Sequence, residues 1–588
     1  MTNSEISKLL SQMASSYTII NEAKYHFQII AYQKAANIIA NSTTEVSDLA
    51  RENKLQNLPG VGSSIQQYLT ELIATGHVKH FEKVMKDVPK ALFPLLEIPS
   101  FGPKKAYNLV SHFNLKNDKT VIEDVQRLAE KGEIAALDGF GEKSQQDILR
   151  AIKEYRSGIN KTSRMTLPFA EELAEKIIEY MRNCPDVDEI YPLGSLRRKK
   201  ETIGDIDIAV SSTKPDRVLL YFIKYPFIER IIEKGDTSSS ILISGGRHVD
   251  LMVQPPKAFG SLLQHFTGSK EHNVHLREFS LKKGLSLSEY GIRENIDPEK
   301  LMEFDNEEKF YKALGLAWIP PEIREDTGEI ELSEKDELPS LVELSEIKGD
   351  LHLHSSYPIE PSHDMGVDSM QKMIDKALEL NYEYLGFSEH NPSKSKHSNK
   401  QVHEILFQRS KFIDQLRMHN KSIRIISLLE TDILPDGSLA IADEALSLLD
   451  ATLVSIHSVF NMTKLDMTKR VLKGLSHKKA KILSHPTGRL INERVGYDLD
   501  WKEIFAFCKS ENKALEINAS PSRLDLKDSL VRIAIEAEVR LFINTDSHAV
   551  DQMNLMRYGV SVARRGWATK DDILNTWEYN NLSRWFKS

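Results

Sequence analysis

One design recurs through residues 347–588 and constrains the fold more than any other feature of this sequence. Apolar, strand-like runs each end in a histidine, aspartate or glutamate, and they alternate with segments of helical pattern. Such alternation is typical of parallel β/α units, whose strands converge at their carboxyl ends. We therefore predict a β/α barrel with metal-competent side chains gathered at its top.

These runs identify the candidate metal ligands. GDLHLH places two histidines two positions apart, on one face of a strand. The full set is His352, His354, His390, Glu430, His457, His485, Asp546 and His548. A single histidine of this kind is usually structural, but chance does not explain eight residues at equivalent places. Imidazole with carboxylate suits Mn²⁺ or Zn²⁺, and we predict two to three ions and hydrolysis of phosphate esters.

Residues 1 to about 155 indicate short helices separated by glycine-containing turns. The turns LPGVGSSI, IPSFGPKKA and LDGFGEKS repeat at intervals of roughly 40 residues. Each leads into a helix whose first amides can face a phosphate. The repeats resemble the helix-hairpin-helix element, which grips the DNA backbone without reading sequence. The candidate DNA-binding residues are Gly60, Gly62, Gly102, Gly139 and Gly141.

A second constellation lies in GSLRRKKETIGDIDIAV, residues 194–210. Asp205 and Asp207 share one strand face, and the strand-like run RHVDLMVQ adds Asp250. Three carboxylates can hold two Mg²⁺ or Mn²⁺ ions for phosphoryl transfer. Ser195 and Arg198, just before the acidic pair, suit the terminal phosphates of a nucleotide.

This constellation resembles the nucleotidyltransferase signature and, with the hairpin repeats, a family X DNA polymerase. The similarity extends to FTGS, residues 266–269. It implies that the three aspartates are catalytic, with Asp250 as the base for the primer hydroxyl. It also implies that the incoming nucleotide is bound by Ser195, Arg198, Gly204, Phe266, Gly268, Asn273 and Arg277. His265 and His248 replace a Tyr and an Arg of animal members, which leaves fidelity and ribose discrimination open.

Residues 347–588 resemble the PHP domain, which in bacterial family X polymerases follows the polymerase and supplies 3′-phosphoesterase activity, including 3′→5′ exonuclease. The resemblance leaves an AP endonuclease activity open. In PHP domains the first motif usually continues to an aspartate in a Ser-Asp-Gly turn. This chain reads SSYPIEPSHDMGVDSM instead. We predict Asp364 as the ninth ligand, with His363 as the rival.

The predicted architecture is multidomain, with an all-α N-terminal region, an α+β nucleotidyltransferase palm and a distorted, TIM-like C-terminal β/α barrel. The predicted boundaries are 1–85 (helix-hairpin-helix domain), 86–160 (helical DNA-binding domain), 161–258 (palm), 259–335 (nucleotide-selection subdomain), 336–346 (linker) and 347–588 (PHP domain). The linker is expected because the segment IREDTGEIELSEKDELPS is polar and acidic.

The bulk composition fits this interpretation. A net charge of -8 means that DNA binding depends on local groups, and two cysteines, Cys184 and Cys508, exclude a disulfide framework. The chain shows neither a signal peptide nor an apolar run long enough to span a bilayer, so we expect a cytoplasmic location. The expected partners are gapped or nicked DNA and dNTPs, without a membrane, and the chain is expected to be a monomer.

We therefore predict a repair polymerase that fills short gaps and carries a metal-dependent 3′→5′ exonuclease. The main alternative keeps the nuclease and uses the polymerase module only as a DNA-binding scaffold. A non-enzymatic DNA-end binder and a phosphatase of small metabolites are two further alternatives. Loss of any one of the three aspartates would have favoured the scaffold, but all three are present.

We expect the chain to be poor at removing a 5′-deoxyribose phosphate. That reaction needs a lysine amine to attack the sugar aldehyde. In animal family members the lysine lies on the helix after the first hairpin, where this chain has Tyr68. Gln28 and Ser64 stand at two positions that are basic in those members.

Overall fold

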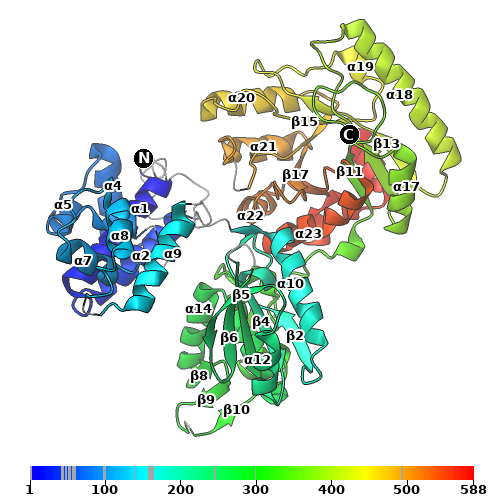
Figure 1. Cartoon of the computed structure of the whole chain (residues 1–588). Coiled ribbons are helices and arrows are strands. Elements are labelled where there is room, and N and C mark those ends of the chain that lie inside the picture. Colours follow the sequence, from blue (N-terminus) through cyan, green and yellow to red (C-terminus); the bar gives the residue numbers. More distant parts are fainter. Residues whose placement is uncertain are drawn as a thin grey trace. The chain divides into compact units, whose positions relative to one another are not determined.

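The computed structural model of the chain describes residues 3–40, 46, 50, 55, 61–96, 98, 101–137, 139–156, 164–243, 247–297, 299–491 and 494–587 (Figure 1). The chain forms two compact units, residues 1–163 and residues 164–588. Among the described residues, every helix is either too short or too polar to cross a membrane.

Every regular element among the described residues of the first unit is a helix, which confirms the predicted all-α region. Its helices are α1 (Asn3–Asn21), α2 (His26–Ala40), α4 (Ser63–Thr75), α5 (Lys79–Met85), α6 (Leu92–Leu95), α7 (Pro103–His112), α8 (Val121–Glu130) and α9 (Glu142–Arg156). Two apolar cores stabilise the unit. The first includes Leu10 and Leu69, and the second includes Leu95 and Ile148.

The second unit begins with a five-stranded sheet, here called the palm sheet, of order β2-β4-β7-β6-β5. The strands are β2 (Glu189–Pro192), β4 (Ile206–Ser211), β5 (Ile228–Lys234), β6 (Ser238–Ile243) and β7 (Arg247–Gln254). The two strands expected from the sequence, β4 and β7, are both present, and helix α10 (Leu167–Arg182) precedes the sheet in the chain. The β4–β7 pair is parallel, whereas the other pairs of this sheet are antiparallel.

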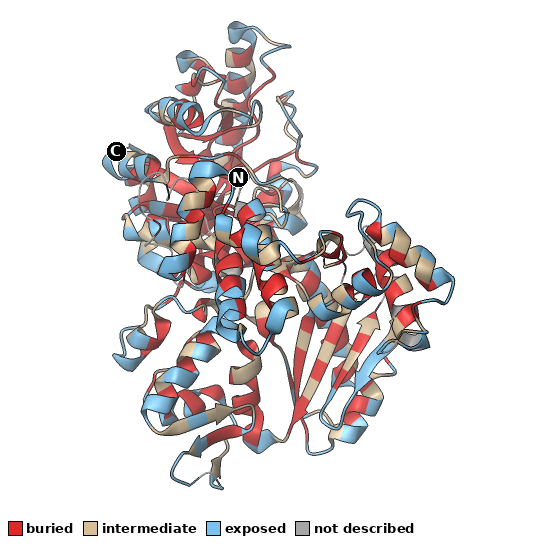
Figure 2. Cartoon of the chain, turned by 90° about the vertical axis from the view of Figure 1, so that its left-hand side faces the viewer, coloured by how far each residue is buried: buried red, intermediate tan, exposed pale blue. Residues whose placement is uncertain are grey.

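The two faces of β4 pack against different helices. Ile208 and Val210 belong to the core that includes α10, whereas Ala209 packs with Phe259 of α13 (Phe259–Thr267). Figure 2 shows the alternation of buried and partly exposed residues along the neighbouring strands β6 and β7. Since Asp207 is two residues from Ala209, its side chain lies on the α13 face.

Short elements surround the palm sheet and lead away from it. They are β1 (Met165–Thr166), α11 (Gly194–Arg197), β3 (Thr202–Ile203), α12 (Pro215–Phe222), η2 (Pro256–Ala258), α13 (Phe259–Thr267), α14 (Lys270–Lys282), β8 (Leu285–Ser288), β9 (Gly291–Glu294), β10 (Leu301–Met302), α15 (Glu307–Ala313), η3 (Pro321–Ile323) and α16 (Glu329–Glu334). Strands β8 to β10 form a small antiparallel sheet.

The acidic segment that we expected to be a linker is instead packed against other parts of the chain. Glu329 is fully buried on α16 and binds His272. Within residues 336–346, Leu341 bridges to Thr569 and the amide of Val342 donates to Ala568. The segment is anchored because its carboxylates have basic partners elsewhere in the chain, which its own composition cannot show.

Residues 347–588 are here called the C-terminal module. Its described residues contain eight strands: β11 (Gly349–Leu353), β12 (Tyr384–Phe387), β13 (Arg424–Ser427), β14 (Glu430–Asp432), β15 (Thr452–Ser455), β16 (Ala480–Leu483), β17 (Ala514–Asn518) and β18 (Arg540–Asn544). The helices are η4 (Leu344–Glu346, just before the module), α17 (Met370–Glu379), α18 (Asn399–His419), α19 (Asp443–Leu446), α20 (Lys464–Leu475), α21 (Trp501–Ser510), α22 (Asp528–Glu536), η5 (Val550–Leu555), α23 (Met556–Arg565), η6 (Lys570–Asp572), η7 (Leu574–Thr576) and α24 (Tyr579–Lys587).

These strands form two parallel sheets, β11-β12-β13 and β14-β15-β16-β17-β18. Isolated parallel bridges, Leu353 to Ser547 and His390 to Glu430, connect them. Most strand residues are buried, as in parallel sheets that are covered on both faces. The predicted parallel β/α alternation is confirmed, whereas a closed barrel stays a prediction.

Candidate active sites

The first candidate site lies on β4 and β7 of the palm sheet. Their parallel register places Asp207 directly opposite Asp250, and Asp205 stands just before β4. The two strands thus bring together the carboxylates that the sequence pattern predicted as one cluster.

Burial and repulsion between like charges shape the protonation of this cluster. Burial, with Asp250 and Asp205 nearby, raises the pKa of Asp207 to about 7. Burial opposes ionisation of Asp250 as well, but the nearby His248 and a hydrogen bond from Ser240 lower its pKa overall. Mutually repelling oxygen donors fit Mg²⁺ or Mn²⁺, because a bound divalent cation removes the repulsion.

Gly194, at the start of α11, is needed for the close approach to Asp207. Its φ is +55°, and a Cβ at this position would lie 2.3 Å from Oδ2 of Asp207. Gly194 lies within the sequence motif, but the motif alone does not reveal this role. Any side chain there would displace the carboxylate.

A cavity of about 390 Å³ is lined by Asp207, Asp250, Leu262, Phe266 and Tyr290, among others. Phe266 is one of the predicted nucleotide-binding residues. Two more of these, Asn273 and Arg277, line a smaller hollow together with His265.

The remaining predicted nucleotide residues flank the acidic pair along the chain. Ser195 lies in α11, and Gly204 separates β3 from Asp205. Arg198 follows α11, and its guanidinium donates to Glu325 over 3.1 Å and to the carbonyl of Thr267 over 2.5 Å. This second contact places Arg198 beside Gly268, where a Cβ would lie 3.0 Å from its Nη1.

The second candidate site is formed by the predicted ligands of the C-terminal module, which all lie within or shortly after strands. They are His352 (β11), His354 (directly after β11), His390 (after β12), Glu430 (β14), His457 (after β15), His485 (after β16) and Asp546 and His548 (after β18). Glu430 differs slightly from expectation, because it begins β14 instead of ending the run before it.

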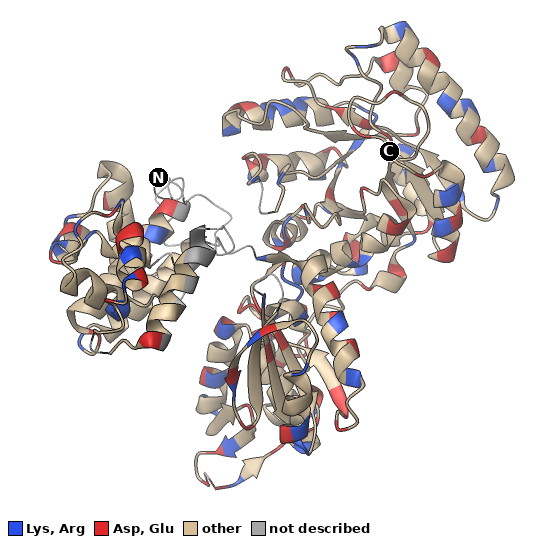
Figure 3. Ribbon diagram, viewed as in Figure 1, with Lys and Arg blue, Asp and Glu red and all other residues tan. Residues whose placement is uncertain are grey.

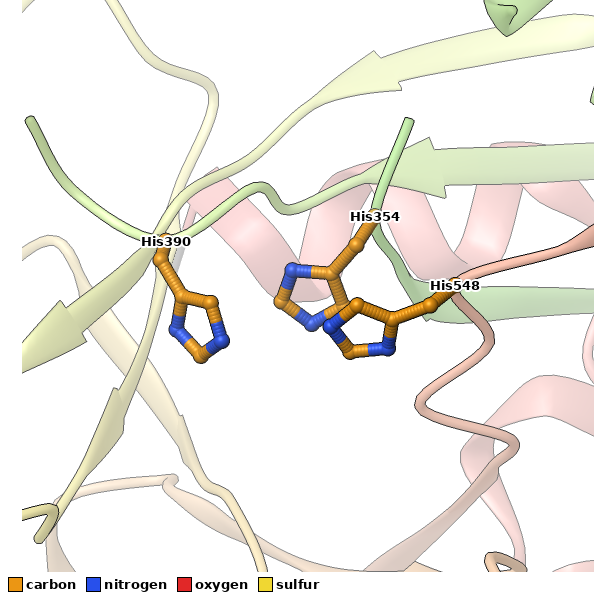
Figure 4. A group of neighbouring side chains, drawn as sticks. All are labelled: His354, His390 and His548. Carbon is orange, nitrogen blue, oxygen red and sulfur yellow. The ribbon is translucent and has the colours of Figure 1, made fainter. Parts of the chain in front are cut away.

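The ligand atoms face one another at short distances. Glu430 lies 2.9 Å from His390 Nδ1 and 2.9 Å from His485 Nε2, and Asp546 lies 3.1 Å from His354 Nε2. His354, His390 and His548 converge from separate segments (Figure 4). Groups whose ligand atoms lie within 4.8 Å of one another are His354–His390–His548, His352–His354–Asp546, His390–Glu430–His457 and His363–Asp432–His457.

This donor set fits bound metal ions. Several of its atoms are buried yet lack a hydrogen-bond partner among the described residues: His352 Nε2, both nitrogens of His354, His390 Nδ1, Glu430 Oε2, His485 Nδ1 and His548 Nε2. Unpaired buried polar atoms are costly unless another group satisfies them. Burial and nearby His390 lower the pKa of His354 to about 3, which keeps its imidazole neutral and able to donate a lone pair.

Both candidates for the ninth ligand border this cluster. Asp364 Oδ1 lies 3.2 Å from His390 Nε2, and its Oδ2 lies 3.3 Å from His548 Nε2. His363 Nε2 lies 3.2 Å from Asp432, and its ring lies 4.3 Å from that of His457. Asp364 places its oxygens near two predicted ligands, and the ring of His363 likewise lies near two, His390 at 5.0 Å and His457 at 4.3 Å, so the assignment stays a prediction.

Two carboxylates that the sequence reasoning missed orient the histidines. Glu516 in β17 lies 2.7 Å from His352 Nδ1 and accepts from the amide of His485 over 2.7 Å. Asp432 lies 2.7 Å from His457 Nδ1. Asp432 could have been found, because it stands two positions after Glu430 in a strand.

The predicted hairpin glycines precede helices of the first unit. Gly62 and Gly102 are the N-caps of α4 and α7, and Gly141 directly precedes α9. Gly139 has a φ of +80°. Gly60 lies outside the described residues.

Tyr68, at the position where animal members carry the reactive lysine, lies in α4. Its ring stacks on His80 at 4.6 Å and meets the edge of Phe81. The expected lack of Schiff-base chemistry stays a prediction.

The chain combines helical hairpins, a palm with paired aspartates and a separate histidine-rich centre. This combination defines the class of DNA polymerases that carry a second metal-dependent centre. Residues 1–78 match the family described as helix-hairpin-helix domain, and residues 262–325 match DNA polymerase beta thumb. Over 563 residues the chain is 33% identical to DNA polymerase/3'-5' exonuclease PolX of Bacillus subtilis (strain 168), which covers 95% of each chain. The chain therefore belongs to family X of the DNA polymerases.

More distant relatives match about half of the chain. DNA polymerase lambda of Rattus norvegicus is 24% identical over 353 residues, which are 55% of this chain and 56% of that protein. DNA polymerase lambda of Arabidopsis thaliana is 24% identical over 360 residues, 55% and 62% of the two chains.

Proposed function

We propose that this chain is a DNA-directed DNA polymerase that fills short gaps during repair, and that its C-terminal module hydrolyses DNA 3′ ends. The register that sets Asp207 opposite Asp250 beside a cavity carries the first part of the proposal. The histidine-rich cluster supports the second part, as does the name of the Bacillus subtilis relative.

In the polymerase site, two Mg²⁺ or Mn²⁺ ions held by Asp205, Asp207 and Asp250 would supply the charge stabilisation that phosphoryl transfer needs. Asp250, kept ionised by its neighbours, accepts the proton of the primer hydroxyl. The predicted nucleotide residues bind the dNTP, with Ser195, Arg198 and Gly204 at its triphosphate.

The hairpins of the first unit grip the DNA backbone. An added Cβ at Gly62, Gly102 or Gly141 would meet open space among the described residues, so the packing of the protein itself does not demand glycine there. A glycine at such a helix start lets a phosphate approach the free amides.

In the C-terminal module, two or three Mn²⁺ or Zn²⁺ ions held by the nine ligands, Asp364 included, would supply Lewis acidity for hydrolysis of phosphate esters. Glu516 and Asp432 fix the ring orientations of His352 and His457. We interpret the two sheets as arcs of a distorted β/α barrel of the PHP type, and an AP endonuclease activity fits the same site.

A primer-extension assay on gapped DNA, with and without dNTPs and in Mg²⁺ or Mn²⁺, tests both halves. We expect extension when dNTPs are present and shortening of the primer when they are absent. Shortening without extension under every condition would favour the alternative in which the polymerase module is a scaffold. The monomeric state and the cytoplasmic location stay predictions.

A further inference from the structure

The loop of residues 198–201 connects the proposed triphosphate residue Arg198 to β3 and the first catalytic aspartate. All four of its side chains are charged, and each has an ionic partner. The pairs are Arg198–Glu325 (3.1 Å), Lys199–Glu171, Lys200–Glu325 (3.7 Å) and Glu201–Arg489 (2.7 Å). The loop beside the nucleotide site is therefore held by ion pairs along its whole length.

Arg565, the last residue of α23 in the C-terminal module, reaches this loop. Its Nη1 donates to the backbone carbonyl of Arg198 over 2.7 Å and to Glu325 over 3.0 Å. Its Nε and Nη2 bind Asp528 at 2.8 and 2.7 Å, and only 3% of its side chain is exposed. In Figure 3 the ribbon is coloured by charge, with lysine and arginine blue and aspartate and glutamate red. Arg565 is thus a buried cation shared between the two modules.

Glu325 binds both Arg565 and Arg198. One of its oxygens, Oε1, accepts from Arg565 and also from Nε of Arg198. Although burial opposes its ionisation, Arg565, Lys200 and Arg198 lower the pKa of its carboxyl group. Arg565 therefore acts on Arg198 in two ways, through the carbonyl of that residue and through the carboxylate that holds its guanidinium.

Arg564 offers a comparison on the same helix. Its contacts are of similar length but fewer than those of Arg565: with Glu322 at 2.8 Å, with Glu343 at 2.5 Å and with the carbonyl of Val342 at 3.2 Å. Those partners tie the modules together without involving the loop of residues 198–201. The neighbouring arginines thus separate attachment of the modules from positioning of the loop.

We propose that Arg565 of the C-terminal module is a positioning residue of the polymerase site, so that dNTP binding at Arg198 depends on the hydrolytic module. The proposal rests on the assignment of Arg198 to the dNTP triphosphate. Truncating Arg565 leaves Glu325 and the Arg198 carbonyl without their shared donor, which lets the Arg198 guanidinium leave its binding orientation.

Single-nucleotide insertion into one-nucleotide gaps tests this, with full-length Arg565→Gln and with Arg564→Gln as the matched control. We expect Arg565→Gln to raise the KM for dNTP about tenfold or more, with a smaller change in kcat. Arg564→Gln should stay within about twofold of wild type, and the 3′ hydrolysis rate of both variants should be near wild type. Arg565→Lys, which keeps the charge but cannot form all these bonds, should be intermediate, and it tests the proposal if Arg565→Gln fails to fold.

Equal KM values for the two glutamine variants would overturn the proposal, as would a parallel loss of extension and hydrolysis in both substitutions of Arg565. The variant Arg198→Ala separates the proposal from its premise. If Arg198→Ala raises the KM for dNTP and the Arg565 variants do not, only the positioning role fails. If Arg198→Ala leaves the KM unchanged, its assignment to the triphosphate is what fails.

Discussion

The two candidate sites gather their side chains in opposite ways. In the palm, two neighbouring strands are enough, because a parallel register alone sets Asp207 beside Asp250 at the edge of a cavity. In the C-terminal module, the predicted ligands come from six strands or the residues just after them, and most of these ligands are nearly fully buried. The first site is an open, all-oxygen donor set, whereas the second is a buried imidazole-rich set.

The pKa values of the ligand side chains also differ between the two sites. In the palm, burial and then repulsion from Asp250 and Asp205 raise the pKa of Asp207, so that all-oxygen site favours a hard cation. In the C-terminal module, burial and nearby His390 keep the imidazole of His354 neutral, whereas acidic neighbours raise the pKa of His352 and His390. The difference teaches that one chain can carry two candidate metal sites of different donor chemistry.

The largest expected effect separates the two sites through the palm. Asp207→Ala should lower primer extension about a thousandfold or more, because the transition state loses charge stabilisation. Hydrolysis of 3′ ends, measured on the same DNA without dNTPs, should persist. Asp216→Ala, which removes an exposed carboxylate of the same sheet region, is the control and should extend normally. Extension by Asp207→Ala at the wild-type rate would refute the assignment.

The converse substitution lies in the C-terminal module. His352→Ala should lower 3′ hydrolysis about a hundredfold or more in Mn²⁺ and leave extension in Mg²⁺ intact, because the two metal sets share no residue. Matched gel assays of shortening and extension measure both rates. His419→Ala, an exposed histidine at the end of α18, is the control. Undiminished hydrolysis in His352→Ala would place the nuclease elsewhere.

A finer test concerns the rim of the hydrolytic site. Asp364→Ala should weaken Mn²⁺ binding about tenfold, and His363→Ala should weaken it less, because Asp364 contacts both His390 and His548. Competition with a metal indicator during titration gives both affinities. The reverse order would make His363 the ninth ligand.

How far the sequence predicted these sites depends on how local the signal is. Asp207 and His352 were found because strand alternation and a motif mark them within a few residues. Glu516 was missed because its role depends on His352, which is far away in the chain and meets it only in the fold. The acidic segment near Glu325 suggested a linker, since nothing nearby reveals that Arg565 would pair with it. Local patterns thus predict elements and ligands, whereas partners of buried charges need the tertiary structure.

The smallest expected effect concerns the stability of the protein and tests the palm site without any activity assay. Asp207 has a folded-state pKa of about 7, well above its ordinary value near 3.8. A carboxyl group with a raised pKa contributes stability below its unfolded-state pKa, and this contribution is lost as the pH rises through about 7. Asp207→Asn keeps the neutral form at every pH, so in EDTA it should be more stable than wild type by about 1–3 kcal/mol at about pH 8, after allowance for partial exposure. The difference should vanish at about pH 4, where both side chains are neutral.

Urea unfolding of both proteins at the two pH values measures this difference in stability, with Asp216→Asn as the exposed control. Added Mg²⁺ should narrow the gap, because the cation stabilises the wild-type carboxylates and binds the variant less well. A variant that is less stable than wild type at both pH values would show that Asp207 is held by favourable contacts rather than by the need for a cation.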